Sequence, residues 1–290
     1  MDQPIGRVAA LWRYPVKSMQ GERLDSSPLG ERGLAGDRRW AVMDVESGRV
    51  VSAKRPKLWG AMLQCAAAYV TDPGAGGQPA TVRITLTGGR EVLSDDPDRD
   101  RLLSEALGRS VTLMSFAAEG ASYELSVGDL QGLEAPEPER MTQAPVALFA
   151  PPGTFYDAST LHVLTTASLE RFAEAHPGGE WDVRRFRPNV LVVLDEAPAD
   201  GFPENEWVGR SLQLGAEVQA AVLAPMPRCV MTTLPQGDLR HDPLILRTIA
   251  ERNRRTLEGY GDYACAGVLA NVAVPGAVAV GDAVSPGGPL

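Results

Sequence analysis

Cysteine, histidine and aromatic residues are scarce in this chain of 290 residues. It contains three cysteines and three histidines, and aromatic residues make up 6% of it. So few cysteines, odd in number, exclude a disulfide scaffold and indicate a reducing compartment. The histidines are far apart in sequence. We expect His162 to be a core residue of an apolar strand, and His176 and His241 to lie in loops.

Excess positive charge and long hydrophobic runs are also lacking. Basic residues number 28 against 37 acidic ones, which gives a net charge of −9. That balance argues against nucleic acid or an anionic membrane as a partner. The longest apolar stretch, 269–280, is interrupted by Asn271 and Pro275, and a bilayer span takes about 20 residues. Because the N-terminus also lacks the apolar core of a signal peptide, we expect a cytoplasmic protein.

Most signatures of familiar enzyme chemistry are missing as well. The sequence contains no phosphate-binding glycine loop of the GxGxxG or GxxxxGK[ST] type. It has no HExxH or CxxC metal motif and no GxSxG nucleophile elbow. Function must therefore be sought in residues that form no common motif.

What the sequence does contain is an excess of turn residues, 30 glycines and 23 prolines. Between them lie short apolar or alternating runs typical of strands, at 5–14, 39–45, 61–70, 81–87, 111–116, 161–164, 189–194, 207–214 and 217–223 and in the tail. Helices are predicted at 96–107, after an N-cap at Thr166, and after Asp242-Pro243. This order predicts a mainly β, barrel-like fold with a few helices and argues against a doubly wound sheet.

An acidic, proline-dotted segment at 117–153 divides the chain. Such composition marks either a domain boundary or a long functional loop. We take it as the boundary between an N-terminal β-rich domain at 1–120 and a second domain at 145–286.

One cysteine lies beside positive charge. In APMPRCVMTT, Cys229 follows Arg228 directly, and positive charge lowers the pKa of a thiol and favours the thiolate. A thiolate suits zinc, copper(I), an iron–sulfur cluster or molybdenum. No second cysteine or histidine is near enough in sequence to complete a zinc site. A buried structural thiol is the competing interpretation.

Two further clusters have the chemistry of an anion site. Arg184, Arg185 and Arg187 precede an apolar strand, and arginines bind phosphate in bidentate fashion. Arg187-Pro188-Asn189 would hold a guanidinium and an amide side by side, although such a cluster can also blunt a sheet edge. Nearer the N-terminus, Lys17 and Ser18 follow a proline. In a strand, Arg38 and Arg39 would face opposite ways, so only one of them could point into a shared pocket.

Taken in order, these segments resemble the MOSC-domain family of molybdenum-cofactor proteins. The similarity is strongest to its two-domain members, which have an N-terminal β-barrel-type domain and include the mitochondrial amidoxime-reducing components and their bacterial relatives. The matching segments are YPVKS (14–18), GDRRW (36–40), FRPNV (186–190), PRCVMTT (227–233) and PGAVAVGD (275–282). They span nearly the whole chain.

The resemblance implies a set of site residues for the molybdenum cofactor (Mo-molybdopterin). Cys229 would be the protein ligand to the metal and hence the catalytic residue. From the first domain, the pterin and its phosphate would be contacted by Lys17, Ser18 and Arg38. The rest of the cofactor site would be formed by Ser159 (in FYDAST), Arg187, Asn189 and Arg228.

The resemblance also implies an activity. Family members of this type reduce N-hydroxylated small molecules such as amidoximes, hydroxylamines and hydroxylated bases. Cys65 and Cys265, the other two cysteines, are too few for a fused four-cysteine cluster domain, so electrons would come from a separate flavin or iron–sulfur protein. Two alternatives stay open: a non-catalytic cofactor carrier or sulfur-handling module, and a metal-free enzyme with Cys229 as nucleophile, which would need a nearby base.

Overall fold

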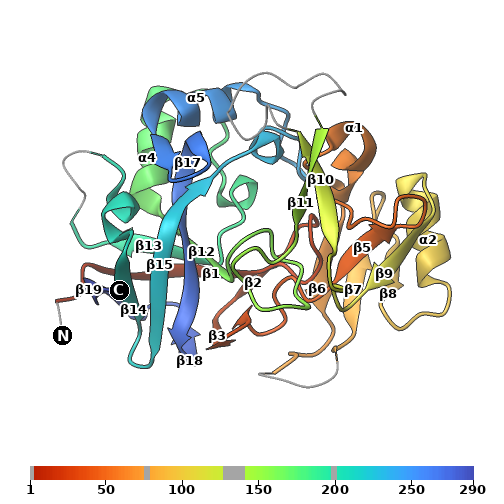
Figure 1. The fold of residues 1–290 in the computed structure, drawn as a ribbon, viewed down its shortest axis with the longest axis horizontal. Helices are drawn as coiled ribbons and strands as arrows, with labels where there is room; N and C mark the ends of the chain where they lie inside the picture. The colour runs from red at the N-terminus through yellow and green to blue at the C-terminus, as the bar shows by residue number, and fades with distance from the viewer. Residues whose placement is uncertain (1–2, 75–78, 127–140, 197–200) are drawn as a thin grey trace.

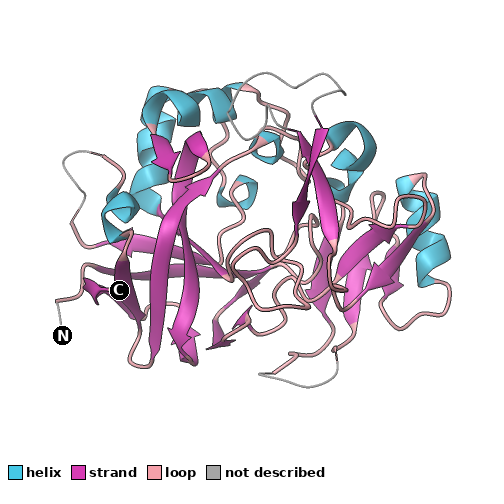
Figure 2. Ribbon diagram, viewed as in Figure 1, coloured by secondary structure: helices cyan, strands magenta, loops and turns pink. Residues whose placement is uncertain are grey.

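A computed structural model describes residues 3–74, 79–126, 141–196 and 201–290 (Figure 1). Seven strands of these residues close into a barrel in the order β12-β13-β1-β19-β14-β15-β17, and β17 pairs back to β12. They are β1 (Gly6–Arg13), β12 (Leu161–Thr165), β13 (Val190–Leu194), β14 (Arg210–Leu214), β15 (Val218–Pro227), β17 (Gly261–Val274) and β19 (Ala283–Pro289). The mainly β fold with few helices is confirmed (Figure 2).

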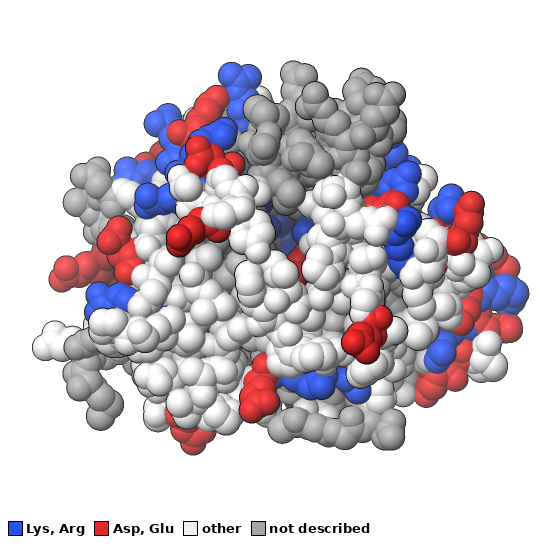
Figure 3. All heavy atoms as spheres, in the orientation of Figure 1, with Lys and Arg blue, Asp and Glu red and all other residues white. Residues whose placement is uncertain are grey.

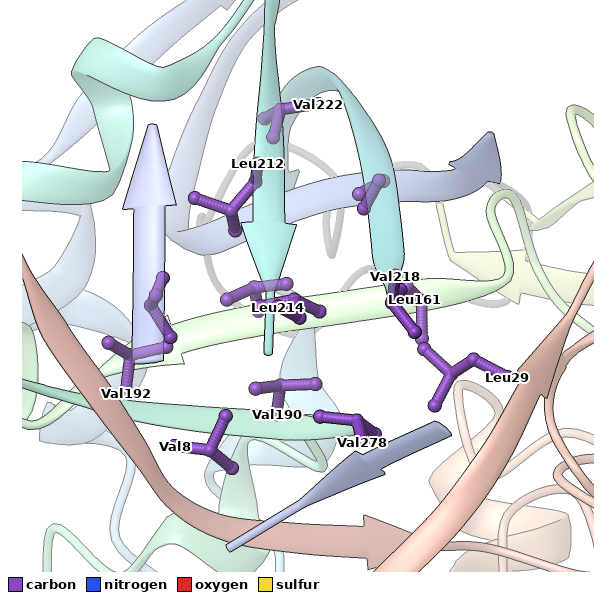
Figure 4. Close-up of a cluster of buried hydrophobic side chains, with 14 of the residues drawn as sticks. Val8, Leu29, Leu161, Val190, Val192, Leu212, Leu214, Val218, Val222 and Val278 are labelled. Carbon is purple, nitrogen blue, oxygen red and sulfur yellow. The ribbon is translucent and has the colours of Figure 1, made fainter. Parts of the chain in front are cut away.

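The barrel interior is filled by aliphatic side chains (Figure 4). Alternate residues of a strand face opposite sides of a sheet, so Leu212 and Leu214 of β14 point inward together with Val218 and Val222 of β15. All four are fully buried. Closure leaves these strands no free edge along the barrel and gives this part of the chain its own core.

Two helices cover one side of the barrel, α4 (Thr166–Ala175) and α5 (Leu244–Arg252). The N-cap of α4 is Thr165, whose hydroxyl accepts from the Ser168 amide at 3.1 Å, one residue before the cap predicted. Thr165 is still extended as the last residue of β12, and a cap needs such a backbone. Helix α5 begins after Pro243, with Asp242 accepting from the amide of Leu244 at 2.9 Å.

The first half of the chain packs around a second core. Its sheets join β5 (Ala41–Asp44) to β9 (Val111–Met114), and β6 (Ala66–Tyr69) to β7 (Val82–Thr85) and β8 (Glu91–Leu93). Helix α2 (Arg99–Leu107) confirms the helix predicted at 96–107. The strand predicted at 61–70 is partly wrong, because Gly60–Gln64 forms a 3₁₀ helix. Shorter elements complete this half: β2 (Glu22–Leu24), β3 (Ser26–Gly30), β4 (Gly33–Leu34) and α1 (Pro56–Trp59).

The two halves of the chain are interlaced. Strand β1 belongs to the barrel, where it pairs with β13 and β19 from the second half. Strand β18 (Gly276–Ala279) pairs with β3 from the first half. The segment predicted as the boundary forms the hairpin of β10 (Ser122–Ser126) and β11 (Met141–Pro145), and its residues 127–140 lie outside the described ranges. The domain limits 1–120 and 145–286 stay a prediction.

The remaining elements are one short strand and three 3₁₀ helices of the second half. Strand β16 (Arg254–Leu257) forms a hairpin with β17, and 3₁₀ helices span Val183–Arg185, Pro203–Trp207 and Val230–Thr232. Within the described residues, no helix is both long enough and apolar enough to cross a membrane.

Candidate functional site

Cys229 lies at a cavity between the barrel and the first half of the chain. It follows β15 and caps the 3₁₀ helix Val230–Thr232, and its carbonyl accepts from the Thr232 amide at 3.1 Å. The amide of Arg228 donates to the carbonyl of Ala264 in β17 at 2.8 Å. These bonds fix the backbone on both sides of the thiol, which is half-buried.

The cavity encloses about 690 Å³, within the range typical of small-molecule and cofactor sites. Figure 3 shows a hollow in the middle of one face of the molecule, with basic side chains inside it. Of the residues expected in a cofactor site, six line the cavity: Lys17, Ser18, Arg38, Arg187, Arg228 and Cys229. The tertiary structure therefore brings together residues up to 212 positions apart in sequence.

The other two expected residues are buried immediately beside the lining. Ser159 follows Ala158, which lines the cavity, and its hydroxyl has no hydrogen-bond partner among the described residues. Asn189 is fully engaged: its Oδ1 accepts from Arg38 Nη1 at 3.1 Å, and its Nδ2 donates to the Trp12 carbonyl at 3.2 Å. Asn189 therefore orients Arg38 rather than presenting its own amide.

Three of the expected residues have an unusual backbone. Ser18, Arg38 and Arg187 have φ values of 65°, 43° and 55°, in the left-handed region. A non-glycine residue there costs on the order of 1–3 kcal/mol, and such strain concentrates at functional sites. Arg38 thus lies in a turn, so the alternation of side chains along a strand does not decide which way it points. Another non-glycine residue of this kind, Ala147, precedes the lining residue Leu148.

Arg38 is held from several directions. It forms an ion pair with Asp37, and its Nη2 donates to the Arg187 carbonyl at 3.2 Å. Its guanidinium carbon lies 4.7 Å from the centre of the Tyr14 ring, and that of Arg187 lies 4.2 Å from it. The pKa of Arg187 is lowered to about 10, first by burial and then by repulsion from Arg38. One aromatic ring thus holds two like charges at the cavity.

The predicted arginine cluster at 184–187 divides between two roles. The described residues that line the cavity include Arg187 but neither Arg184 nor Arg185. Arg184 pairs with Asp182 at 2.8 Å and Asp238 at 2.6 Å. Arg185 is fully buried and donates to the carbonyls of Thr232, Leu234 and Arg240 at 3.2, 3.2 and 2.7 Å. Arg185 therefore anchors the segment that follows Cys229.

Arg228 presents unused donors. Its Nη2 donates to the Phe186 carbonyl at 2.8 Å, but Nε and Nη1 are buried with no hydrogen-bond partner in the described part of the chain. Burial lowers the pKa of this guanidinium. A buried donor without a partner costs about 1–3 kcal/mol, more when charged. An anionic group in the cavity would satisfy these donors.

Two charged residues of the cavity, Lys54 and Asp157, were not predicted from the sequence. Lys17 forms an ion pair with Asp157 and donates to the Phe155 carbonyl at 2.9 Å, and Lys54 contacts the other Asp157 oxygen at 3.0 Å. Lys54 also donates to the Tyr123 hydroxyl at 3.2 Å. Burial lowers the pKa of Lys17 to about 8 although Asp157 opposes it. Asp157 lies two residues before Ser159 in FYDAST, but nothing in that segment distinguished it as a site residue.

Lys54 lies in the electrostatic field of the thiol. Burial would lower the pKa of Lys54, but Asp157, Tyr123 and Cys229 together raise it above its ordinary value. Both Lys54 and Arg228 are thus influenced by Cys229. A fixed positive charge near a thiol favours its thiolate, the form that binds a metal.

The lining fits a phosphate-bearing cofactor that binds metal through sulfur. Five basic side chains line one cavity together with the Cys229 thiol, and buried donors of Arg228 and of the neighbouring Ser159 have no partner among the described residues. Arginine donors suit phosphate oxygens, and thiolate suits a soft metal centre. The arrangement is that of an anionic cofactor site rather than of a catalytic triad, since the His162 ring, which contacts the Ala266 carbonyl at 3.0 Å, is buried in β12 as predicted.

Comparison with known families agrees with this geometry. Residues 5–110 match the family described as the MOSC N-terminal beta barrel domain, and residues 151–285 match the MOSC domain. The chain belongs to the two-domain MOSC family. In this MOSC chain both matched regions contribute to the cavity, the first through Lys17, Ser18 and Arg38 and the second through Arg228 and Cys229.

Curated relatives cover most of this MOSC protein. It is 27% identical to mitochondrial amidoxime-reducing component 1 of Homo sapiens, over 97% of this chain and 83% of the relative. It is 25% identical to mitochondrial amidoxime reducing component 2 of Bos taurus, over 80% of this chain and 67% of the relative. Molybdenum cofactor sulfurase of Oryza sativa subsp. japonica is 25% identical over 83% of this chain, which covers 30% of that protein.

The other two thiols lie in cores. Cys65 lies within the strand predicted at 61–70 but is buried just before the observed β6, and Cys265 is buried within β17. Cys265 pairs with Pro227, two residues before Cys229. Burial raises the pKa of Cys265 to about 12, so it stays protonated and unsuited to metal binding at neutral pH.

Proposed function

We propose that this MOSC protein is a molybdenum-cofactor-dependent reductase of N-hydroxylated small molecules. The observation that carries the proposal is the combination of Cys229 with unsatisfied Arg228 donors in one cavity. The similarity to amidoxime-reducing components supports the reaction type. Electrons would come from a separate flavin or iron–sulfur protein.

In this proposal Cys229 holds the metal, and basic side chains hold the pterin phosphate. Lys17, Ser18 and Arg38 approach from the first half of the chain, and Arg187, Arg228 and Ser159 from the second, while Asn189 orients Arg38. When bound, the cofactor supplies the two-electron chemistry that removes oxygen from nitrogen. The protein's contribution is binding, orientation and a site partly shielded from water.

The overall reaction balances with a donor protein. An N–OH group takes up two electrons and two protons and becomes N–H plus water. The electrons leave the donor protein, which is oxidised, and the protons come from solvent. No oxidant or further co-reactant is needed.

Metal analysis tests the ligand assignment. Protein made in a host that synthesises the cofactor is expected to contain molybdenum, and Cys229→Ala to contain far less. Cys65→Ala, which removes a thiol from the core of the first half, is the matched control and keeps the metal. Equal molybdenum in wild type and Cys229→Ala would show that Cys229 is not the ligand.

A second candidate function rests on the similarity to molybdenum cofactor sulfurase. A carrier or sulfur-handling module would bind the cofactor in the same cavity. It would transfer the cofactor to an apo-enzyme and turn over no N-hydroxylated compound with a chemical electron donor. Amidoxime reduction by the purified, loaded protein would decide for the reductase.

A further inference from the structure

We infer that the substrate carries an aromatic or branched apolar group, which docks on an apolar wall of the cavity, with its oxidised nitrogen toward Cys229. The apolar wall consists of Leu148, Phe149, Leu223, Met226, Leu257 and Tyr260. This inference rests on the proposed function. It goes further by naming what the substrate must look like away from the reacting nitrogen.

The residues that line the cavity form two chemically distinct groups. The first group, the charged side, consists of Lys17, Arg38, Lys54, Asp157 and Arg228 and suits an anionic cofactor. A pterin with its phosphate is polar and charged, so it accounts for that side alone. The charged groups of the cofactor would not contact the apolar wall, so the wall is available to another ligand.

The first part of the apolar wall is built directly beside the charged side. The amide of Leu148 donates to the Asp157 carbonyl at 3.4 Å, and that of Phe149 to the Ala158 carbonyl at 3.1 Å. Asn271 fixes the same segment by donating to the Phe149 carbonyl at 2.7 Å. Leu148 and Phe149 are nevertheless 44% and 49% exposed. A backbone held this firmly that still presents large apolar side chains to the cavity is suited to a ligand.

Strand β15 supplies the second part. Its residues alternate between buried and half-buried up to Val222, but Leu223 is 40% exposed and lines the cavity. The register with β17 shifts between Val222 and Ala224 and again between Pro225 and Pro227. Bulges of this kind redirect side chains near active sites. Here they bring Leu223 and Met226 to the same cavity as Cys229, six and three residues further along.

The turn between β16 and β17 supplies the third part. The amide of Tyr260 donates to the Leu257 carbonyl at 2.9 Å, and the Tyr260 carbonyl accepts from the Tyr263 hydroxyl at 3.0 Å. Tyr260 is 61% exposed although its ring is large and apolar. The face around the hollow is largely uncharged (Figure 3).

Apolar side chains from three separate segments thus converge on one cavity. Small-molecule sites combine mostly apolar walls with a few polar groups that fix orientation. A flat arene or a branched alkyl group would bury against the wall, whereas a bare hydroxylamine would gain nothing from it. We therefore expect selectivity for the apolar part of the substrate.

The test compares two amidoximes that differ away from the reacting nitrogen. With cofactor-loaded enzyme and a chemical electron donor, kcat/KM for benzamidoxime is expected to exceed that for acetamidoxime by about tenfold or more. Leu223→Ala should reduce this ratio several-fold, mainly through KM. Leu244→Ala is the matched control: Leu244 is 45% exposed but lies on α5, apart from the cavity lining, and its substitution should leave the ratio unchanged.

A binding measurement separates this inference from the proposed function. Calorimetry with benzamidoxime and the oxidised, loaded protein should show weaker binding to Leu223→Ala than to Leu244→Ala. If Leu223→Ala binds benzamidoxime more weakly but wild type reduces neither compound, the proposed function is wrong and the apolar wall is still a ligand-binding surface. Turnover with no preference, or no detectable binding, would overturn the inference. If Leu223→Ala slows both compounds equally with a protein donor and neither with a chemical one, the wall docks that donor instead and the inference is wrong.

Discussion

The guanidinium carbon of Arg187 lies 4.2 Å from the centre of the Tyr14 ring, and Arg38 lies 4.7 Å from the same ring. Both arginines line the cavity, and both have a left-handed backbone. Two cations so close repel each other, and the negative face of an aromatic ring offsets part of that cost. Tyr14 is therefore a positioning residue for the anion site.

Substitution of Tyr14 tests this role. Each cation–π contact is worth about 0.5–2 kcal/mol, so Tyr14→Leu should weaken binding of inorganic pyrophosphate about tenfold in calorimetry. Tyr14→Phe keeps the ring, and the Tyr14 hydroxyl has no hydrogen-bond partner among the described residues. The Phe variant should therefore bind as wild type does. Equal loss in both variants would assign the role to the hydroxyl.

Lys17 should make stability depend on pH at the alkaline side. Burial lowers its pKa from 10.5 to about 8, so between pH 8 and 10.5 the unfolded state binds more protons than the folded state. Stability must then rise with pH across that window, by at most about 3 kcal/mol. In urea unfolding at several pH values, the free energy of unfolding of wild type minus that of Lys17→Met should therefore rise with pH across this window, because other buried groups such as Cys265 contribute equally to both proteins. If the free energy of unfolding depends on pH in the same way in wild type and Lys17→Met, the prediction is wrong.

Arg184 and Arg185 are adjacent but should differ in their effect on stability. Arg185 is fully buried and donates to three carbonyls of the segment 232–240, whereas the Arg184 pairs are partly exposed. Arg185→Met should lower the free energy of unfolding by about 2–4 kcal/mol, because it leaves buried carbonyls unsatisfied. Arg184→Met should cost less than about 1 kcal/mol. Denaturant melts of both variants give the comparison, and similar losses would refute the distinction.

The three thiols should differ in reactivity. Cys229 lines the cavity, whereas Cys65 and Cys265 are buried and burial raises the pKa of both. Iodoacetamide should therefore add one group to the folded, cofactor-free protein, located at Cys229 by peptide mass spectrometry. Loading with the cofactor should protect that thiol. Modification of Cys265 at a similar rate would mean that β17 is less tightly packed than the structure shows.

Much of the fold could be read from local sequence. Short apolar runs separated by glycine and proline indicated the β-rich class, and the helix at 99–107 follows from its leucine spacing and ends at Gly108. Secondary structure was predicted wrongly where a local sequence pattern is compatible with two conformations. The apolar run at 61–70 begins as a 3₁₀ helix, because packing decides between conformations that propensity leaves nearly equal.

The candidate site was only partly predictable for a similar reason. Motifs around Lys17, Arg38, Arg187 and Cys229 carried the family resemblance, but no local pattern singled out Lys54 or Asp157. Their importance arises from burial: Asp157 joins two lysines that are 37 residues apart in sequence. An ion pair between segments that are far apart in the chain leaves no repeating pattern in the sequence from which it could be predicted.

By itself, the sequence determined the chemistry available to this protein: one thiol beside an arginine, basic residues in an acidic chain, and strands separated by turns. The tertiary structure alone decided how those residues are used. It placed β1 among strands of the second half, assigned Arg185 to the interior and Arg187 to the cavity, and brought the apolar wall and the charged residues into one cavity. Side-chain direction and burial depend on contacts between distant segments, so they exist only after the chain has folded.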